Sequence, residues 1–352
     1  MDLIERILEF ARGNNCSDIH LSYGLPPIFR INGDVVRSDF ELSNEEIFKM
    51  INSLLDDNQK KLLQEKIDVD FAFEKRGLRY RVNVYYQQGS IAAAIRLLND
   101  TIPTLEKLDL PPAIEKLASM PNGLVLVTGP TGSGKSTTLA AMIDYINSTR
   151  KGHILTLEDP VEYLHKNKKS ILHQREVGTD VIDFKSALKS ALREDPDVIL
   201  VGEMRDLETI SAAITAAETG HLVLSTLHTT GAANTIDRII DSYPEGDKNQ
   251  VRAQLATTLR GVVTQQLIPN LTRTKRVPAF EILIMNAAIS NLIRENKCFQ
   301  INSILQTGTK EGMVALNNDL ARLVKCGEIS VEDAIEKTNN PQILARLVDI
   351  SI

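Results

Sequence analysis

Short apolar runs alternate with helical patterns through the middle of the chain. The runs lie at 123–128, 153–157, 197–201 and 221–225, and the helical stretches at 134–149, 183–194 and 206–219. Continuous apolar runs of this length are typical of parallel strands that are covered on both faces. Their alternation with helices predicts βαβ units, and therefore an α/β fold with a doubly wound parallel sheet.

The first hundred residues show a different pattern. It predicts a helix over 1–12, a helical stretch over 43–66, a turn at 32–34, and strands at 18–22, 28–31, 69–73, 78–85 and 91–97. The stretch 78–85 alternates apolar and polar residues, as a half-buried antiparallel strand does. This mixture predicts a small α+β domain.

The ends of these patterns give the expected domain boundaries. Residues 99–103 break the last N-terminal strand, and Pro111 and Pro112 can open a new helix. Beyond 286 the chain is mostly helical, with patterns at 286–295, 300–306, 312–325 and 330–338. We expect an N-terminal domain over 1–99, a linker over 100–110, a core over 111–285 and a helical region over 286–352.

The composition excludes several classes of protein. The 352 residues are 43% apolar and 24% charged, which is ordinary for a globular chain and excludes a disordered one. A net charge of −6 argues against a broad basic surface for nucleic acid. The basic segments 166–169 and 273–276 contain no aromatic residue, so we expect solvated loops or subunit contacts there.

Membrane spans and disulfides are not indicated either. No apolar run approaches the roughly 18 residues of a spanning helix, and the N-terminus has the pattern of an amphipathic helix, not of a secretory signal. The cysteines Cys16, Cys298 and Cys326 are far apart and form no CxxC pair. They indicate neither a disulfide framework nor a zinc site, so we expect a cytoplasmic protein.

The strongest chemical signal is a glycine-rich loop between a predicted strand and a predicted helix. It consists of Gly129, Pro130, Thr131, Gly132, Ser133, Gly134, Lys135, Ser136 and Thr137, and fits G-x-x-x-x-G-K-[ST]. Backbone N–H groups of such a loop surround phosphate oxygens, and the helix presents its positive end to them. Lys135 would reach the terminal phosphates and Ser136 would ligate Mg²⁺, so the loop predicts a nucleotide site.

Carboxylates follow two of the other apolar runs. Glu158, Asp159 and Glu162 come directly after one, and Glu203 follows another, with Gly202 intervening. Ligands of parallel sheets bind at this edge, where a carboxylate can position or deprotonate water or contact Mg²⁺. Without the phosphate loop, a solvated acidic loop would be the simpler interpretation. Arg205 lies near the expected phosphates, or it simply pairs with Glu203.

Two histidines mark the ends of the last predicted strand: His221 opens it and His228 closes it. A strand advances about 3.3 Å per residue, so the two side chains cannot hold one phosphate together. His228, at the carboxyl end, is the better candidate to sense a terminal phosphate. We keep His221 as a nucleotide-binding candidate beside the alternative of a structural histidine.

These four motifs, in this order, resemble the secretion ATPase superfamily that powers type II secretion and type IV pili. The resemblance covers the whole chain: 129–137 corresponds to the Walker A loop, 156–162 to the Asp box, 198–205 to the atypical Walker B strand and 220–229 to the His box. It implies a PAS-like N-terminal domain, a RecA-like ATPase core and a helical tail.

The resemblance also implies roles for individual residues. Glu162 would be the catalytic base, and Glu203 would act through Mg²⁺, directly or through water. From their places in the motifs, we also expect Glu158 and Arg205 at the nucleotide. Arg81 and Arg96 of the N-terminal domain match arginines that face the ATP of an adjacent subunit. It further implies a homo-hexamer at the cytoplasmic face of the membrane, attached only peripherally through an inner-membrane pilus platform protein and without nucleic acid.

Within the superfamily, the chain is similar to the motors that retract pili. It lacks the paired cysteines and the extra N-terminal domain of assembly ATPases, and residues 288–294, AISNLIR, resemble the AIRNLIR motif of retraction motors. Ser290 replaces the first arginine of that motif. An assembly or secretion ATPase remains the first alternative, a RecA-like nucleic-acid translocase the second and a non-hydrolysing scaffold the third.

Overall fold

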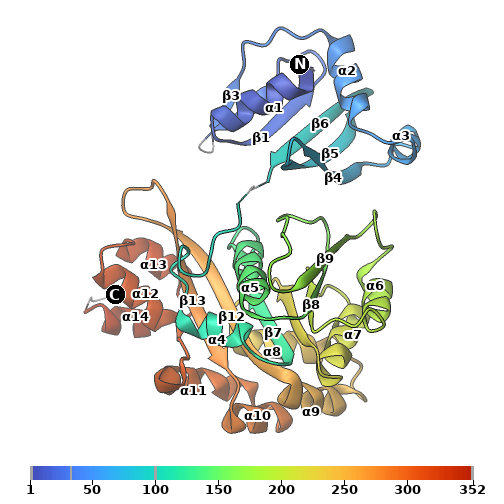
Figure 1. Ribbon diagram of the computed structural model, residues 1–352. Coiled ribbons are helices and arrows are strands. Elements are labelled where there is room, and N and C mark those ends of the chain that lie inside the picture. The colour runs from blue at the N-terminus through green and yellow to red at the C-terminus, as the bar shows by residue number, and fades with distance from the viewer. Residues whose placement is uncertain (1–2, 32–33, 99–100, 350–352) are drawn as a thin grey trace. The chain divides into compact units, whose positions relative to one another are not determined.

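The computed structural model describes residues 3–31, 34–98 and 101–349 (Figure 1). The chain divides into two compact units, one of Met1–Thr101 with Pro160–Leu164 and one of Ile102–Asp159 with His165–Ile352. The predicted turn at 32–34 and break at 99–103 fall partly on residues 32, 33, 99 and 100, which lie outside the described residues.

The first unit pairs helices with one antiparallel sheet. Its elements are α1 (Leu3–Gly13), β1 (Cys16–Ser22), β2 (Ile28–Ile31), β3 (Asp34–Arg37), α2 (Asn44–Ser53), α3 (Asp57–Gln64), β4 (Val69–Lys75), β5 (Leu78–Gln87) and β6 (Ser90–Leu97). The strand order is β3-β2-β1-β6-β5-β4. Its core includes Ile7, Ile19, Ile51 and Val82, all fully buried.

The predicted helical stretch over 43–66 is two helices. Ser43 and Glu46 form a capping box at the start of α2, and Asp56 and Gln59 form another at the start of α3. In each box the first side chain accepts a backbone N–H that the helix leaves unpaired, and the second returns the contact. The second box starts a new helix and so divides the stretch.

The second unit begins with α4 and alternates strands with helices. Its elements are α4 (Pro112–Ala118), β7 (Gly123–Thr128), α5 (Lys135–Thr149), β8 (His153–Glu158), β9 (Ile171–Glu176), α6 (Phe184–Ala191), β10 (Val198–Val201), α7 (Leu207–Glu218), β11 (Leu222–Leu227), α8 (Ala232–Asp241), α9 (Lys248–Thr258), β12 (Leu259–Pro269) and β13 (Arg276–Ile284). The tail adds α10 (Ala287–Arg294), η1 (Cys298–Gln300), α11 (Ile301–Thr307), η2 (Gly308–Glu311), α12 (Leu316–Lys325), α13 (Val331–Lys337) and α14 (Pro341–Leu347).

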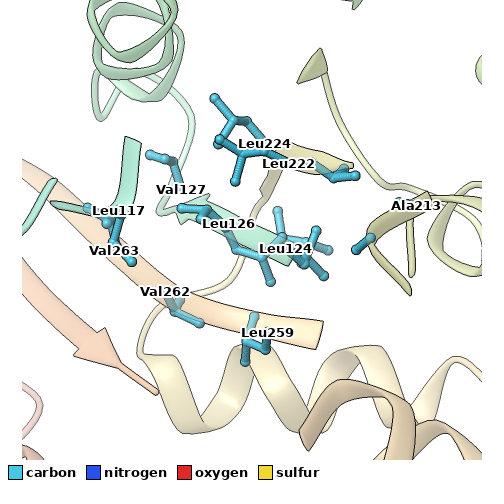
Figure 2. Packing of buried hydrophobic residues seen from close by; sticks show 14 of the residues in the cluster. Leu117, Leu124, Leu126, Val127, Ala213, Leu222, Leu224, Leu259, Val262 and Val263 are labelled. Atoms are coloured by element: carbon cyan, nitrogen blue, oxygen red, sulfur yellow. The ribbon is translucent and has the colours of Figure 1, made fainter. Parts of the chain in front are cut away.

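The strands of the second unit form one sheet in the order β13-β12-β7-β11-β10-β8-β9. All neighbours are parallel except the hairpin of β12 and β13. The strands β7, β10 and β11 are buried along their whole length, and their side chains pack with Leu117 of α4 and Ala213 of α7 (Figure 2). The predicted α/β class with a parallel sheet is confirmed.

The tail helices pack on the hairpin through a core cluster of their own. Ile268 of β12 and Ala279 of β13 are buried with Leu320 of α12 and Leu344 of α14. The helix α14 was not predicted from the sequence. No helix among the described residues is long and apolar enough to cross a membrane.

Candidate nucleotide site

The phosphate loop lies between the end of β7 and the start of α5, as its sequence predicts. Gly129, Gly132 and Gly134 have φ angles of 141°, 76° and 91°, which favour glycine. A Cβ on Gly129 would lie 2.2 Å from the backbone oxygen of Gln265 in β12, so this glycine also permits close packing. The loop therefore turns tightly and keeps its backbone at the carboxyl edge of the sheet.

Lys135 is folded back onto this loop. Its side chain is 8% exposed, and Nζ donates to the carbonyl oxygens of Gly129 at 2.9 Å and Pro130 at 3.0 Å. The ammonium group is thus held beside the loop backbone, where a terminal phosphate would replace the neutral carbonyl acceptors with negatively charged oxygens.

The first turn of α5 is open to an anion. Its N-cap is Gly134, which has no side chain that could accept a hydrogen bond from the first backbone N–H groups of the helix. Ser136 is exposed on this turn, while Thr138 donates to Oε1 of Gln265 at 2.7 Å. The uncapped, positive end of a 15-residue helix beside Lys135 fits a phosphate group.

Glu203 follows β10, and Thr226 of the neighbouring strand β11 holds the backbone on both sides of it. Thr226 accepts the N–H of Met204 through its backbone at 3.1 Å and donates its hydroxyl to the carbonyl of Gly202 at 2.7 Å. A Cβ on Gly202 would lie 3.3 Å from the carbonyl of Leu157 in β8, so glycine allows close approach there. The Glu203 side chain is fixed and only 13% exposed.

The side chains of Arg205 and His228 lie beside the Glu203 carboxylate. Arg205 contacts Oε1 at 2.6 Å, and Nε2 of His228 lies 3.6 Å from Oε2. The Arg205 side chain is 72% exposed and pairs with Glu203, which was one of the two roles predicted for it. His228 follows β11 directly, and thus lies on the same edge as the phosphate loop, as predicted.

Glu158 and Glu162 of the Asp box belong to different units of the chain. Glu158 ends β8, and its Oε1 accepts Thr156 at 2.6 Å and Gln174 at 3.1 Å. Glu162 is half-buried in the segment 160–164, which belongs to the first unit. Its role as base therefore stays a prediction.

His221 lies at the opposite edge of the sheet. Its carbonyl accepts the N–H of Gly123, where β7 starts, and its Nδ1 is 2.9 Å from the carbonyl of Ala216. The full length of β11 separates it from the phosphate loop. The strands β11 and β7 are parallel and begin side by side, so His221 lies at the edge where they begin. The structure therefore does not support its assignment to the nucleotide site of its own chain.

A cavity of about 450 Å³ adjoins the phosphate loop. Its apolar walls include Leu108, Leu110, Leu267 and Phe280, and Thr137 and Thr138 of α5 form the side next to the loop. Arg322 of α12 also lines it. Sequence reasoning missed this cavity because its walls come from the linker, the hairpin and the tail.

Arg276 is another residue that the sequence did not single out for this site. The segment 273–276 was expected to be a solvated loop or a subunit contact. Arg276 instead lines the cavity, and its guanidinium lies 3.5 Å from the carbonyl of Gly132 in the phosphate loop. Arg273 is paired with Asp333 at 3.2 Å.

The two predicted trans-acting arginines are neighbours within the first unit. Arg81 of β5 and Arg96 of β6 are register partners. Arg81 contacts Asp70 at 2.6 Å and Arg96 contacts Asp18 at 2.9 Å. Both arginines lie on one face of the sheet, each with an aspartate from an adjoining strand.

The chain is similar along nearly its whole length to proteins of one known family. Residues 1–346 match the family described as "Type II/IV secretion system protein". The "Type IV pilus retractation ATPase PilT" of Pseudomonas aeruginosa is 49% identical over 344 residues, which cover 97% of this chain and 99% of that protein. The "Twitching motility protein" of Neisseria gonorrhoeae is 51% identical over 321 residues, covering 91% and 86%.

A solved structure gives the same result for the fold. It is described as "Crystal Structure of the Pilus Retraction Motor PilT and Bound ADP" and is 49% identical in sequence. The two chains superpose with a TM-score of 0.92 over 98% of this chain and 99% of that one.

Proposed function

The chain belongs to the type II/IV secretion system protein family and is an ATPase of that family, and on this premise we propose that it is the motor that retracts type IV pili. The observation that carries the proposal is the near full-length similarity, at about half of all positions, to two proteins of pilus retraction and twitching motility. The phosphate loop, Glu203 and His228 lie at one sheet edge, where they would supply the chemistry that a motor of this kind needs.

The nucleotide would lie across the phosphate loop and the adjoining cavity. Residues 129–137 would hold the phosphates through backbone N–H groups and Lys135. The base would enter the apolar part of the cavity between Leu110, Leu267 and Phe280, which together exclude water from an aromatic ring. Arg276 would then stand near the sugar and phosphates, because it spans from the cavity wall to Gly132.

A magnesium ion fits the residues at this edge. Ser136 is exposed on the first turn of α5, and the carboxylate of Glu203, which follows β10, is held in place by Arg205. When bound, Mg²⁺ supplies positive charge to the phosphate oxygens. Hydroxyl and carboxylate oxygens are the ligands that this ion prefers.

Other side chains would activate the attacking water and stabilise the negative charge of the transition state. Glu162 would accept the proton of the attacking water, and His228 would contact the terminal phosphate. Arg81 and Arg96 would approach the nucleotide of an adjacent subunit in a homo-hexamer, after leaving Asp70 and Asp18. An arginine supplied in trans can raise turnover by several orders of magnitude.

We further propose a cytoplasmic location at the membrane surface. There the hexamer would attach peripherally, through an inner-membrane platform protein of the pilus machine, and without nucleic acid. A net charge of −6 and the absence of tryptophan agree with a protein partner over a nucleic-acid one.

Deletion of the gene separates the proposal from its alternatives. If the protein retracts pili, cells without it carry excess surface pili and do not move, as seen by electron microscopy and a surface-motility assay. If it assembles pili, the same cells carry none, and if it is a secretion ATPase, pili are unchanged while secreted proteins accumulate inside.

A further inference from the structure

The amino end of α8 has no capping side chain of its own. Its N-cap is Gly231, which makes no side-chain contact to the helix, and its first turn holds no acidic residue. The N–H of Ala232 instead donates to Oε1 of Glu281 in β13, at 2.8 Å. Glu281 is only 3% exposed, so this is a buried carboxylate placed at the positive end of a helix.

Burial raises the pKa of the Glu281 carboxyl, and the hydrogen bond from Ala232 opposes that rise. A buried carboxylate is costly unless its oxygens are bonded. A glutamate at this position is therefore not explained by packing, because an apolar side chain would fill β13 without that cost. The hydrogen bond from the N–H of Ala232 in α8 indicates what the carboxylate does there.

The loop that follows His228 is tied to the same turn of α8. The hydroxyls of Thr229 and Thr235 are 2.7 Å apart, and Thr235 also donates to the carbonyl of Gly231 at 2.8 Å. Asn234 donates to the carbonyl of Thr230 at 2.9 Å. Hydrogen bonds to the first turn of α8 therefore hold all three residues between His228 and this helix, 229–231.

A cavity adjoins that turn beside Glu281. A cavity of about 300 Å³ is lined by Thr230, Gly231, Gln266, Glu281 and Lys337. Without the contact to Glu281, the turn would border this space on one side with an unpaired N–H. The contact thus selects one position of the loop among those that the cavity would allow.

The strand β13 extends the connection to the tail. The N–H of Phe280 donates to Oδ2 of Asp319 in α12 at 2.8 Å, and Asp319 also accepts Nε of Arg322 at 2.8 Å. Phe280 and Arg322 line the cavity next to the phosphate loop. Adjacent residues of a strand point to opposite faces, so β13 joins the nucleotide cavity on one face to the His228 loop on the other.

We propose that Glu281 is a positioning residue for ATP hydrolysis, which acts by fixing the first turn of α8 and thereby the place of His228 beside Glu203. The inference rests on the proposed role of His228 at the terminal phosphate. It assigns no contact between Glu281 and the nucleotide.

A double-mutant cycle on the full-length protein tests this proposal. ATP turnover is measured for Glu281→Ala and Thr235→Val, each in the parent chain and in a His228→Asn chain. In the parent chain we expect kcat to fall about tenfold for Glu281→Ala, as expected when a catalytic group is misplaced, with KM for ATP within about twofold. In the His228→Asn chain, neither substitution should lower kcat by more than about twofold, because the group they position is gone.

Two further variants complete the cycle. Glu281→Gln retains an oxygen that can accept the N–H of Ala232, so it should keep kcat within about threefold. Asp183→Ala removes a carboxylate cap at α6, where Asp183 accepts the N–H of Ser186 at 2.7 Å, and should leave kcat unchanged in both backgrounds. If Glu281→Ala does not fold, Thr235→Val carries the same comparison, because it is nearly isosteric and removes only the hydroxyl contacts.

The outcomes distinguish an error in the role of Glu281 from an error in the role of His228. Equal losses of kcat in the parent and His228→Asn chains would overturn the positioning role of Glu281 while leaving the proposed function intact. An unchanged kcat in His228→Asn alone would overturn the proposed role of His228, and this inference with it. A rise in KM without a fall in kcat would also contradict the proposal, because it would mean that Glu281 serves nucleotide binding.

Discussion

Nε2 of His228 lies 3.6 Å from Oε2 of Glu203, at the carboxyl ends of two adjacent strands, β11 and β10. The relationship follows from the sheet, because Thr226 bonds the backbone on both sides of Glu203 and stands two residues before His228. A carboxylate suited to Mg²⁺ and a ring suited to a phosphate thus share one edge with Lys135.

Replacing Lys135 tests the phosphate loop. Lys135→Ala should lower kcat for ATP by at least about 10²-fold, since charge-assisted contacts contribute roughly 1.5–3 kcal/mol each. The fold should persist, because Nζ of Lys135 donates to the carbonyl oxygens of Gly129 and Pro130, which belong to the same loop. Phosphate release and thermal unfolding are measured together, with Lys151→Ala as an exposed lysine control. Turnover equal to that of the control would exclude the loop as the hydrolytic site.

The two glutamates of the Asp box should differ in their effects. Glu162→Gln should retain ATP binding but lose at least about 10²-fold in turnover, because an amide cannot accept the proton of water. Glu158→Gln should lose less than about tenfold, since an amide oxygen can still accept Thr156 and Gln174. Single-turnover hydrolysis and nucleotide binding are compared for both proteins. The reverse order of losses would assign the base to Glu158.

The sequence predicted the parts of this site that are local in the chain. The phosphate loop, Glu203 and His228 each follow an apolar strand, and parallel strands bring such positions to one edge. His221 was retained as a candidate although it precedes the same strand, and register then put it at the other edge.

What the sequence did not predict depends on contacts between distant segments. The cavity beside the loop combines Leu110 with Phe280 and Arg322, which are far apart in the chain. The strand β13 and the helix α9 also went unassigned. In α9 only Val251, Leu255, Ala256 and Thr258 are buried, too few for a clear apolar stripe.

Shared sites should appear when two inactive proteins are mixed. Arg96→Ala lacks the trans-acting arginine and Lys135→Ala lacks the loop cation, so each should be nearly inactive alone. Mixed rings should recover part of the turnover, because some interfaces then combine an intact loop with an intact arginine. Arg37→Ala, on the edge strand β3, serves as a control that should remain active. Full activity of Arg96→Ala alone, or no recovery on mixing with verified subunit exchange, would contradict a shared site.

Stability should depend on His165 in acid. Burial lowers the pKa of His165 to about 4, and its Nδ1 has no hydrogen-bond partner among the described residues. An unfolded histidine titrates near 6.5, so between about 6.5 and 4 the unfolded chain binds a proton that the folded chain does not. The contribution of this group to stability is therefore complete above about 6.5 and is lost as the pH falls towards 4.

Urea unfolding at several pH values measures this effect. His165→Asn should show a smaller loss of stability between pH 6.5 and 4 than the parent protein, whatever its stability at pH 7. Parallel curves for the two proteins over that range would mean that His165 is protonated in the folded state.

The most direct test of the account is retraction in cells whose only copy of the protein carries Lys135→Ala. Pilus retraction and the number of surface pili are measured by fluorescence microscopy of labelled pili, with the parent protein and Lys151→Ala expressed at equal levels. We expect Lys135→Ala cells to keep excess, static pili, as is expected of deletion cells, while both controls retract. Retraction at the parent rate in Lys135→Ala cells would contradict the claim that ATP hydrolysis at this loop drives the motor.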